Sequence, residues 1–235
     1  MTKLSVEEIQ SWGESFEDKQ PQEVLAAAIE RYAPKIVLAC SFGAEDVVLV
    51  DMVHRINPSV TLFYLDTDFL FPETYATRDR IIKQYGLQSA QVLQVKSLLT
   101  PEHQAEQHGA ALWASDPDRC CQLRKVEPLT RVLKGFEAWI TGIRRDQAPT
   151  RANAKLIEWD AKFQLVKVNP LAKWTWADVW TYIKVYEVPY NELHDRNYPS
   201  IGCTHCTAPV MPGEDPRAGR WKNNAKTECG LHKAS

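Results

Sequence analysis

Hydrophobic and polar residues follow two alternating patterns along the first part of the chain. A continuous apolar run at 35–40 is typical of a strand buried on both faces of a sheet, and further strands are expected at 60–65, 91–95 and 138–143. Two of the segments between them, 47–56 and 72–85, have the apolar spacing of helices. This alternation predicts an α/β fold, an open, mostly parallel twisted sheet with helices on both faces.

The N-terminal segment and the chain from residue 101 onwards predict further helices and an antiparallel pair of strands at one edge of the sheet. Ser5 with Glu8 has the spacing of a capping box, and Pro21 suits the first turn of a second helix. The other expected elements are a helical stretch at 101–135, an antiparallel pair at 156–159 and 163–168, and a helix at 176–186 capped by Thr175. Prolines and glycines beyond Val188 interrupt regular structure. We therefore expect one domain, 1–235, in which residues 207–235 form an irregular, mobile catalytic tail.

The charge balance narrows the classes of partner. The chain has 28 Lys and Arg against 30 Asp and Glu, which argues against nucleic acid as a partner. It has no apolar run long enough to span a membrane, and its first residues lack the apolar segment of a signal peptide. We therefore expect a cytoplasmic protein with no membrane partner. In that compartment six cysteines indicate metal ligation or redox chemistry before disulfides.

The spacing of four cysteines is the strongest chemical signal. Cys120 and Cys121 are adjacent, and Cys203 and Cys206 form a C-x-x-C pair far downstream. Adjacent cysteines do not readily form an unstrained disulfide, whereas four thiolates suit a soft metal or an iron–sulfur centre. Zinc ligand pairs usually keep two to four residues between them, and the separate irons of a cluster can each take one of two neighbouring thiolates. The spacing favours a [4Fe–4S] cluster; four unrelated buried cysteines are the alternative.

Two cysteines remain outside this set. Cys229 lies between Glu228 and Gly230 near the end of the chain, and it is the candidate nucleophile. A thiol reacts as its thiolate, which cationic neighbours would favour, and His232 could assist. An incidental exposed cysteine is the alternative. Cys40 ends an apolar run and is expected to be a small buried residue of the core.

A turn between the first strand and the following helix is the candidate nucleotide site. It reads Ser41-Phe42-Gly43-Ala44-Glu45-Asp46. Backbone N–H groups and the helix dipole can hold a phosphate at such a turn, and Gly43 permits close approach. Asp66 follows the next strand at the same edge of the sheet, where ligands of open α/β sheets bind. The turn matches neither the Walker pattern nor G-x-G-x-x-G, so an ordinary strand-to-helix turn is an equal alternative.

Several cations are candidate ligands for an anionic substrate, because guanidinium groups bind phosphate or sulfate oxygens in bidentate fashion. They are Arg124, Lys125, Arg144, Arg145, Arg151, Arg217 and Arg220. Arg124 and Lys125 follow the cysteine pair within about one helical turn. For each of these two alone, a solvated helix face is the alternative.

Taken together, these motifs resemble the assimilatory sulfonucleotide reductases, in particular the iron–sulfur adenylyl-sulfate (APS) reductases. The resemblance covers nearly the whole chain. It rests on Ser41-Phe42-Gly43-Ala44-Glu45-Asp46, Leu65-Asp66-Thr67, Phe71-Pro72-Glu73-Thr74, Cys120-Cys121-x-x-Arg124-Lys125, Arg144-Arg145-Asp146-Gln147, Tyr198-Pro199-Ser200-Ile201-Gly202-Cys203-x-x-Cys206 and Glu228-Cys229-Gly230-Leu231-His232.

The resemblance implies an adenine nucleotide α-hydrolase-like fold in which the Ser41 turn receives the nucleotide. It also implies that a [4Fe–4S] cluster is held by Cys120, Cys121, Cys203 and Cys206, and that the phosphosulfate is bound by Lys125 with Arg124, Arg151, Arg217 and Arg220. In the implied mechanism, Cys229 attacks the sulfate sulfur, AMP leaves and an S-sulfocysteine forms. Thioredoxin then reduces this adduct and sulfite is released, a step in sulfate assimilation and cysteine biosynthesis.

Three alternatives stay open at this stage. Reduction of the 3′-phosphorylated nucleotide (PAPS), alone or beside APS, is not excluded by anything in the Ser41 turn. An ATP-pyrophosphatase-type ligase or tRNA sulfur-insertion enzyme shares the implied fold, but it carries Ser-Gly-Gly-x-Asp-Ser where Phe42 and Ala44 stand here. A zinc-stabilised RNA-binding module would need a long basic stripe, which the sequence lacks. The sequence leaves the oligomeric state open, including a homo-oligomer.

Overall fold

The computed structural model describes residues 4–222, 226 and 228–231. Within these residues the strands form one sheet in the order β3-β2-β1-β4-β6-β5. They are β1 (Ile36–Ala39), β2 (Thr61–Asp66), β3 (Val92–Lys96), β4 (Ala138–Ile140), β5 (Ile157–Asp160) and β6 (Leu165–Val168). All neighbouring pairs are parallel except β5 with β6 at one edge, which confirms the predicted sheet and its antiparallel pair.

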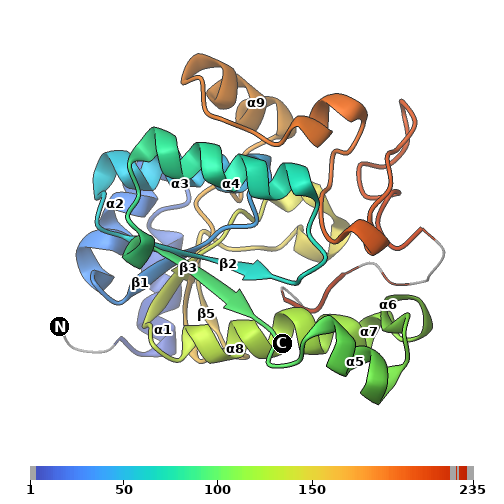
Figure 1. The fold of residues 1–235 in the computed structure, drawn as a ribbon. Helices are drawn as coiled ribbons and strands as arrows, with labels where there is room; N and C mark the ends of the chain where they lie inside the picture. The colour runs from blue at the N-terminus through green and yellow to red at the C-terminus, as the bar shows by residue number, and fades with distance from the viewer. Residues whose placement is uncertain (1–3, 223–225, 227, 232–235) are drawn as a thin grey trace.

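Helices cover both faces of this sheet. They are α1 (Val6–Glu14), α2 (Pro21–Tyr32), α3 (Ala44–Ile56), α4 (Pro72–Tyr85), α5 (Pro101–His108), α6 (Leu112–Ser115), α7 (Pro117–Cys121), α8 (Glu127–Leu133) and α9 (Trp176–Val185). In Figure 1, α2, α3 and α4 lie over one face and α8 lies under the other. The predicted capping box of Ser5 and Glu8 forms at the start of α1, and Thr175 with Asp178 forms another at α9.

The sheet separates two layers of the hydrophobic core. Successive residues of a strand point to opposite faces. Leu38 accordingly packs into the larger cluster with α2 and α3, whereas Val37 packs into a second cluster with Trp139 and with Leu129 of α8. Cys40 is 3% exposed and belongs to the larger cluster, so its predicted place in the core is confirmed.

The segment after β3 differs from the continuous helix that the apolar pattern predicts at 101–135. It is divided into α5, α6, α7, a π-helical turn (Gln122–Val126) and α8. Gly109 ends α5 with φ of 92°, a conformation that other residues rarely adopt. Asp116 then caps α7 with Pro117 in its first turn. The apolar spacing is the same in one long helix and in these pieces, which is why the pattern misses the breaks.

The chain beyond α9 crosses the carboxyl ends of the parallel strands, where Figure 1 shows it in orange and red. Its regular parts, among the residues described, are short 3-10 helices at Glu192–Arg196 and Thr204–Cys206. A β-bridge between Leu70 and Cys203 ties it to the loop after β2. The predicted irregularity of this region is confirmed, and mobility of the 207–235 tail stays a prediction. Within the described ranges every helix is too short or too polar to cross a lipid bilayer.

Candidate active site and the cysteine cavity

A cavity of about 340 Å³, here called the main cavity, lies at the carboxyl ends of the parallel strands. This is the edge at which open α/β sheets bind their ligands. It brings together most of the residues that the sequence singles out. They are Ser41, Phe42, Gly43, Ala44, Glu45, Lys125, Arg144, Arg151, Arg217, Arg220 and Cys229.

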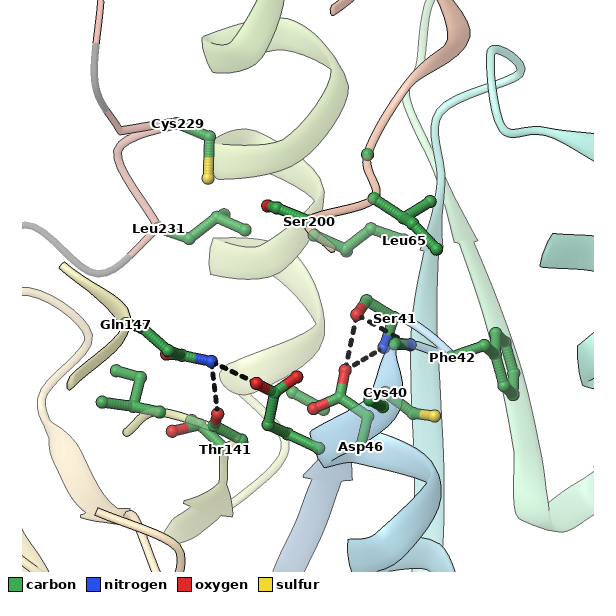
Figure 2. Close-up of a pocket in the computed structure, with 18 of the residues that line it drawn as sticks. Cys40, Ser41, Phe42, Asp46, Leu65, Thr141, Gln147, Ser200, Cys229 and Leu231 are labelled. Carbon is green, nitrogen blue, oxygen red and sulfur yellow. Dashed lines mark hydrogen bonds between the residues drawn. The ribbon is translucent and has the colours of Figure 1, made fainter. Parts of the chain in front are cut away.

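The turn between β1 and α3 is held by its own side chains. Asp46 accepts hydrogen bonds from the amide of Ser41 at 2.5 Å and from its hydroxyl at 2.6 Å, as Figure 2 shows. Phe42 is buried and has φ of 59°, so the left-handed residue of the turn is Phe42, whereas Gly43 has an ordinary φ of −74°. Asp46 and Phe42 therefore fix the direction in which the first amides of α3 face the cavity.

Burial raises the pKa of Asp46 to about 6, although the hydrogen bonds from Ser41 act in the opposite direction. The carboxylate is also packed closely against the end of β4. A Cβ atom added at Gly142 would lie 2.4 Å from an Asp46 oxygen. The site thus requires glycine at this position.

Arg144 is engaged by acidic residues of the site. Its guanidinium donates to Glu45 at 3.0 Å and forms a second ion pair with Asp146, and it lies over the ring of Trp176. Gln147 donates to the same Glu45 oxygen at 2.9 Å. Arg144 therefore braces the Ser41 turn through Glu45, and part of its charge is already neutralised.

Two of the predicted anion ligands meet at one carboxylate. Glu228 accepts from Nε of Arg151 at 3.1 Å and from Nη2 of Arg151 at 3.0 Å, while Nη2 of Arg217 lies 3.3 Å from the same carboxylate. Thr150 donates to it at 3.2 Å. Burial opposes the charge of Glu228, but these partners lower its pKa below the ordinary value.

Arg220 lies at the cavity against the C-x-x-C loop. Its guanidinium donates to the carbonyl of Cys206 at 3.3 Å and to the hydroxyl of Ser200 at 3.2 Å. A Cβ atom at Gly202 would meet the guanidinium at 2.4 Å, so glycine is needed for this close approach. The ring of Trp221 lies beneath the guanidinium at 4.6 Å. Arg220 is thus held rigidly at the cavity wall.

Cys229 enters the main cavity from the tail. Figure 2 shows its sulfur directed into the space between the tail and the sheet, across from Ser41. Lys162 donates to the carbonyl of Gly230 at 2.6 Å, and Leu231 packs on the core cluster around Trp139. These contacts dock the described end of the tail against the body of the protein. His232, a predicted site residue, lies outside the described residues.

Four cysteines surround a second, smaller cavity, here called the cysteine cavity. Its lining includes Cys120, Cys121, Cys203 and Cys206, brought together from α7 and from the loop after Ile201. Burial, followed by the nearby thiols of the other three, raises the pKa of Cys120 to about 12. Thr67 lies 3.3 Å from the sulfur of Cys203. The predicted grouping of these four cysteines is therefore present in the fold.

Lys125 lines both cavities. Burial opposes its charge, but the thiols of Cys203, Cys229 and Cys121 favour it, and the pKa of Lys125 is raised. Trp221 also lines both cavities and forms part of the wall between them. Lys125 is thus placed to act on an anion in the main cavity and on a charged group among the cysteines.

The four cysteines of this cavity are a donor set that suits an iron–sulfur cluster, since each iron of such a cluster takes one thiolate. In the described part of the chain, no group of three or more His, Cys, Asp or Glu side chains forms a site for a single metal ion. Arg124 also lines this cavity, and its buried Nη2 has no hydrogen-bond partner among the described residues. A buried donor of this kind suits an anionic group in the cavity.

Besides Arg145, which pairs with Glu17 at 2.7 Å and is not part of the cavity lining, two predicted substrate ligands do not line the main cavity. Arg124 is 1% exposed and binds Asp68 at 2.9 Å and Gln104 at 2.7 Å, on the side of the cysteine cavity. Asp66 is 2% exposed and accepts hydrogen bonds from Tyr75 and Gln94. Both are positioned to support the loops around the site.

Comparison with known proteins agrees with this geometry. The family model of the phosphoadenosine phosphosulfate reductase domain matches residues 35–209. The chain belongs to this family. Among curated relatives, the adenosine 5′-phosphosulfate reductase of Shouchella clausii is 48% identical over 92% of this chain and 89% of its own length. That of Staphylococcus haemolyticus is 50% identical over 92% of this chain and 88% of its own length.

Solved structures share the fold of this chain. The phosphoadenylyl-sulfate (PAPS) reductase of Candida auris, solved as a phosphate complex, has a TM-score of 0.77 and 34% identity over 88% of this chain and 99% of its own. Candida glabrata FMN adenylyltransferase has a TM-score of 0.60 at 14% identity, covering 97% of this chain and 77% of its own, which shows a shared fold alone. The likeness to the Candida auris reductase confirms the predicted α/β fold, an open, mostly parallel sheet with helices on both faces.

The sequence does not predict the roles of three residues of this reductase-family site. Glu228 stands out only as a neighbour of Cys229, yet it binds the arginines. Asp46 belongs to the predicted turn without a role of its own, yet it fixes that turn, and Trp221, which is not among the candidates, lines both cavities. The signal available for Glu228 was a carboxylate next to the nucleophile in a chain whose other site residues are cations.

Proposed function

We propose that this chain reduces adenylyl sulfate to sulfite and AMP, with thioredoxin as the electron donor. The observation that carries the proposal is that Cys229 and the Ser41 turn line one cavity, together with Lys125, Arg151, Arg217 and Arg220. Such a cavity combines a nucleotide turn, a nucleophile and cations for a charged leaving group. The curated relatives named adenosine 5′-phosphosulfate reductase, at 48 to 50% identity, support the same activity.

The substrate would span the cavity from the Ser41 turn to the arginines. The N-terminal amides of α3 offer hydrogen bonds to the nucleotide, as helix N-termini do for phosphate groups. The cations at the other side would bind the phosphosulfate oxygens. This orientation points the sulfur atom towards Cys229.

In the first step the Cys229 thiolate attacks the sulfate sulfur. An S–S bond forms, the bond from sulfur to the phosphate oxygen breaks, and its electron pair leaves with AMP. Negative charge thus grows on the departing phosphate, and fixed cations are the main means by which a protein can stabilise it. Lys125 and Arg217 are the residues placed to do so. The product on the protein is an S-sulfocysteine at Cys229.

In the second step the dithiol of thioredoxin reduces the adduct. The dithiol is oxidised to a disulfide, the sulfur is reduced by two electrons and leaves as sulfite, and the Cys229 thiol is restored. The adduct must reach a partner protein, and a position near the end of the chain suits this requirement.

Cys120, Cys121, Cys203 and Cys206 would hold a [4Fe–4S] cluster. When bound, the cluster supplies a fixed anionic centre that orients the cations beside it. Arg124 would donate a hydrogen bond to it. Lys125, which lines both cavities, would place its charge between the cluster and the substrate. The buried, mutually close thiols and the unpartnered nitrogen of Arg124 support this assignment.

PAPS is the second candidate substrate, because the Candida auris structure with a TM-score of 0.77 is a PAPS reductase. Steady-state kinetics with both nucleotides separates the two. We expect kcat/KM for APS to exceed that for PAPS, and a higher value for PAPS would contradict the proposed substrate. Trapping the S-sulfocysteine on Cys229 without thioredoxin tests the reaction itself.

A further inference from the structure

The carboxylate of Glu228 occupies the place where an anionic substrate would be expected. Its side chain is buried, at 6% exposure, and lines the main cavity. Both oxygens face Arg151, and one of them also faces Arg217. Burying these three charges costs desolvation free energy, which is offset only when the hydrogen-bond geometry is good. Here Arg151 binds both oxygens of Glu228 in bidentate fashion.

The charges around it explain why an anion is needed there. Arg151 and Arg217 are both largely buried, with side-chain exposures of 11% and 18%. Two buried guanidinium groups at one point repel each other unless an anion lies between them. Glu45 is committed to Arg144 on another wall of the cavity. Glu228 is therefore an anion that offsets both Arg151 and Arg217.

A carboxylate and a phosphate or sulfate group present similar acceptors to arginine. Both offer two oxygens in one plane, which match the fork of N–H groups on guanidinium. Thr150 adds a hydroxyl donor to the same carboxylate, at 3.2 Å. Glu228 thus makes the contacts that would bind two oxygens of a phosphosulfate.

We propose that Glu228 is a tethered anion that holds Arg151 and Arg217 until the phosphosulfate of the sulfonucleotide replaces it, and that it thereby sets the affinity for the substrate. This inference rests on the proposed function. Because Glu228 and Cys229 are consecutive residues, exchange of the two anions also releases the peptide that carries the nucleophile. Substrate binding is in this way coupled to the freedom of Cys229 to turn towards the sulfur.

Equilibrium binding of APS tests the exchange. The measurement uses the full chain carrying Cys229→Ser, so that the nucleotide is not consumed. Adding Glu228→Gln removes the charge and keeps the size of the side chain. We expect the dissociation constant for APS to fall about tenfold, because the nucleotide no longer competes with a carboxylate. Glu214→Gln is the matched control, since it removes an exposed carboxylate from the same tail outside the cavity lining. It should leave the constant unchanged.

A second comparison separates competition from a structural role. If Glu228 acts through Arg217, the gain from Glu228→Gln should shrink when Arg217→Met is also present, as a double-mutant cycle measures. Additive effects would contradict the proposal. Glu228→Asp keeps the charge but shortens the side chain, which weakens its contacts with both arginines, and it should tighten binding in the same direction by a smaller factor. This variant does not depend on how well the Glu228→Gln chain folds.

The outcomes distinguish this inference from the proposed function. If the Cys229→Ser chain binds APS but Glu228→Gln leaves the affinity unchanged or weaker, the tethered-anion role is wrong and the reductase assignment stands. If the Cys229→Ser chain binds no sulfonucleotide at all, both fall together.

Discussion

The carboxylate of Asp46 accepts two hydrogen bonds from Ser41, one from the amide and one from the hydroxyl. This pair closes the turn that presents the first amides of α3 to the main cavity. The two residues lie within six positions of each other in the sequence. The cost of ionising Asp46, however, is set by the surrounding fold, because burial raises the pKa of Asp46 to about 6.

This raised pKa predicts a pH dependence of stability. The folded chain holds the Asp46 proton more tightly than the unfolded chain, so the contribution of Asp46 is largest at low pH and is lost as pH rises from about 4 to about 6. Asp46→Asn lacks this loss. Relative to the parent, the variant should gain about 1 kcal/mol between pH 4.5 and pH 7.5, allowing for partial solvent screening. Urea unfolding at the two pH values measures it, and a pH-independent difference would contradict the shift.

The contact between Gly142 and Asp46 predicts a steric effect. Gly142→Ala places a methyl group 2.4 Å from the Asp46 carboxylate, so the turn or the end of β4 must shift. We expect a loss of about 2 kcal/mol in the free energy of unfolding and weaker nucleotide binding. Gly135→Ala is the matched control, because its Cβ would meet no atom closer than 3.7 Å. Equal effects of the two substitutions in thermal unfolding would argue against this packing.

Lys125 predicts a catalytic effect that a surface lysine would not have. Lys125→Ala removes a cation from the wall of the main cavity, and kcat/KM for APS should fall about a hundredfold or more. Lys134→Ala, at an exposed position after α8, should leave it within twofold or so of the parent. Sulfite release measures both. Parallel losses in the two variants would reassign Lys125 to a solvated role.

The four-cysteine site predicts an iron content. The parent, purified without oxygen, should carry about four irons per chain and absorb near 400 nm, and Cys203→Ser should lose most of both. Cys40→Ala should keep them, because Cys40 belongs to the hydrophobic core and not to the cysteine cavity. A colourless parent that holds zinc would overturn the cluster assignment.

The sequence predicts the sheet well because the parallel strands are short and mostly apolar and a helical pattern follows β1 and β2. It does not predict the breaks between α5 and α8, since the apolar spacing continues through Gly109 and Asp116. It also cannot place Arg124, because the choice between the two cavities depends on Asp68 and Gln104, which are distant in sequence.

In the candidate site, too, local motifs could be predicted from the sequence, whereas contacts between distant residues could not. Motif residues such as Ser41, Cys229 and the arginines could be named from local sequence, and the structure gathers them. The ion pair of Glu228 with Arg151 joins residues 77 positions apart, and no local pattern encodes such a contact. Asp46 was visible in the motif, but its role follows from burial and could only be seen in the fold.

Transfer of the sulfo group to Cys229 is the central claim, and one measurement tests it most directly. The chain is incubated with APS labelled at sulfur, without thioredoxin, and the label on intact protein is counted and located by peptide mass. We predict label close to one per chain on the parent at Cys229, its release as sulfite when thioredoxin is added, and none on Cys229→Ser. Equal labelling of Cys229→Ser, or a parent that turns over without acquiring label, would contradict the account.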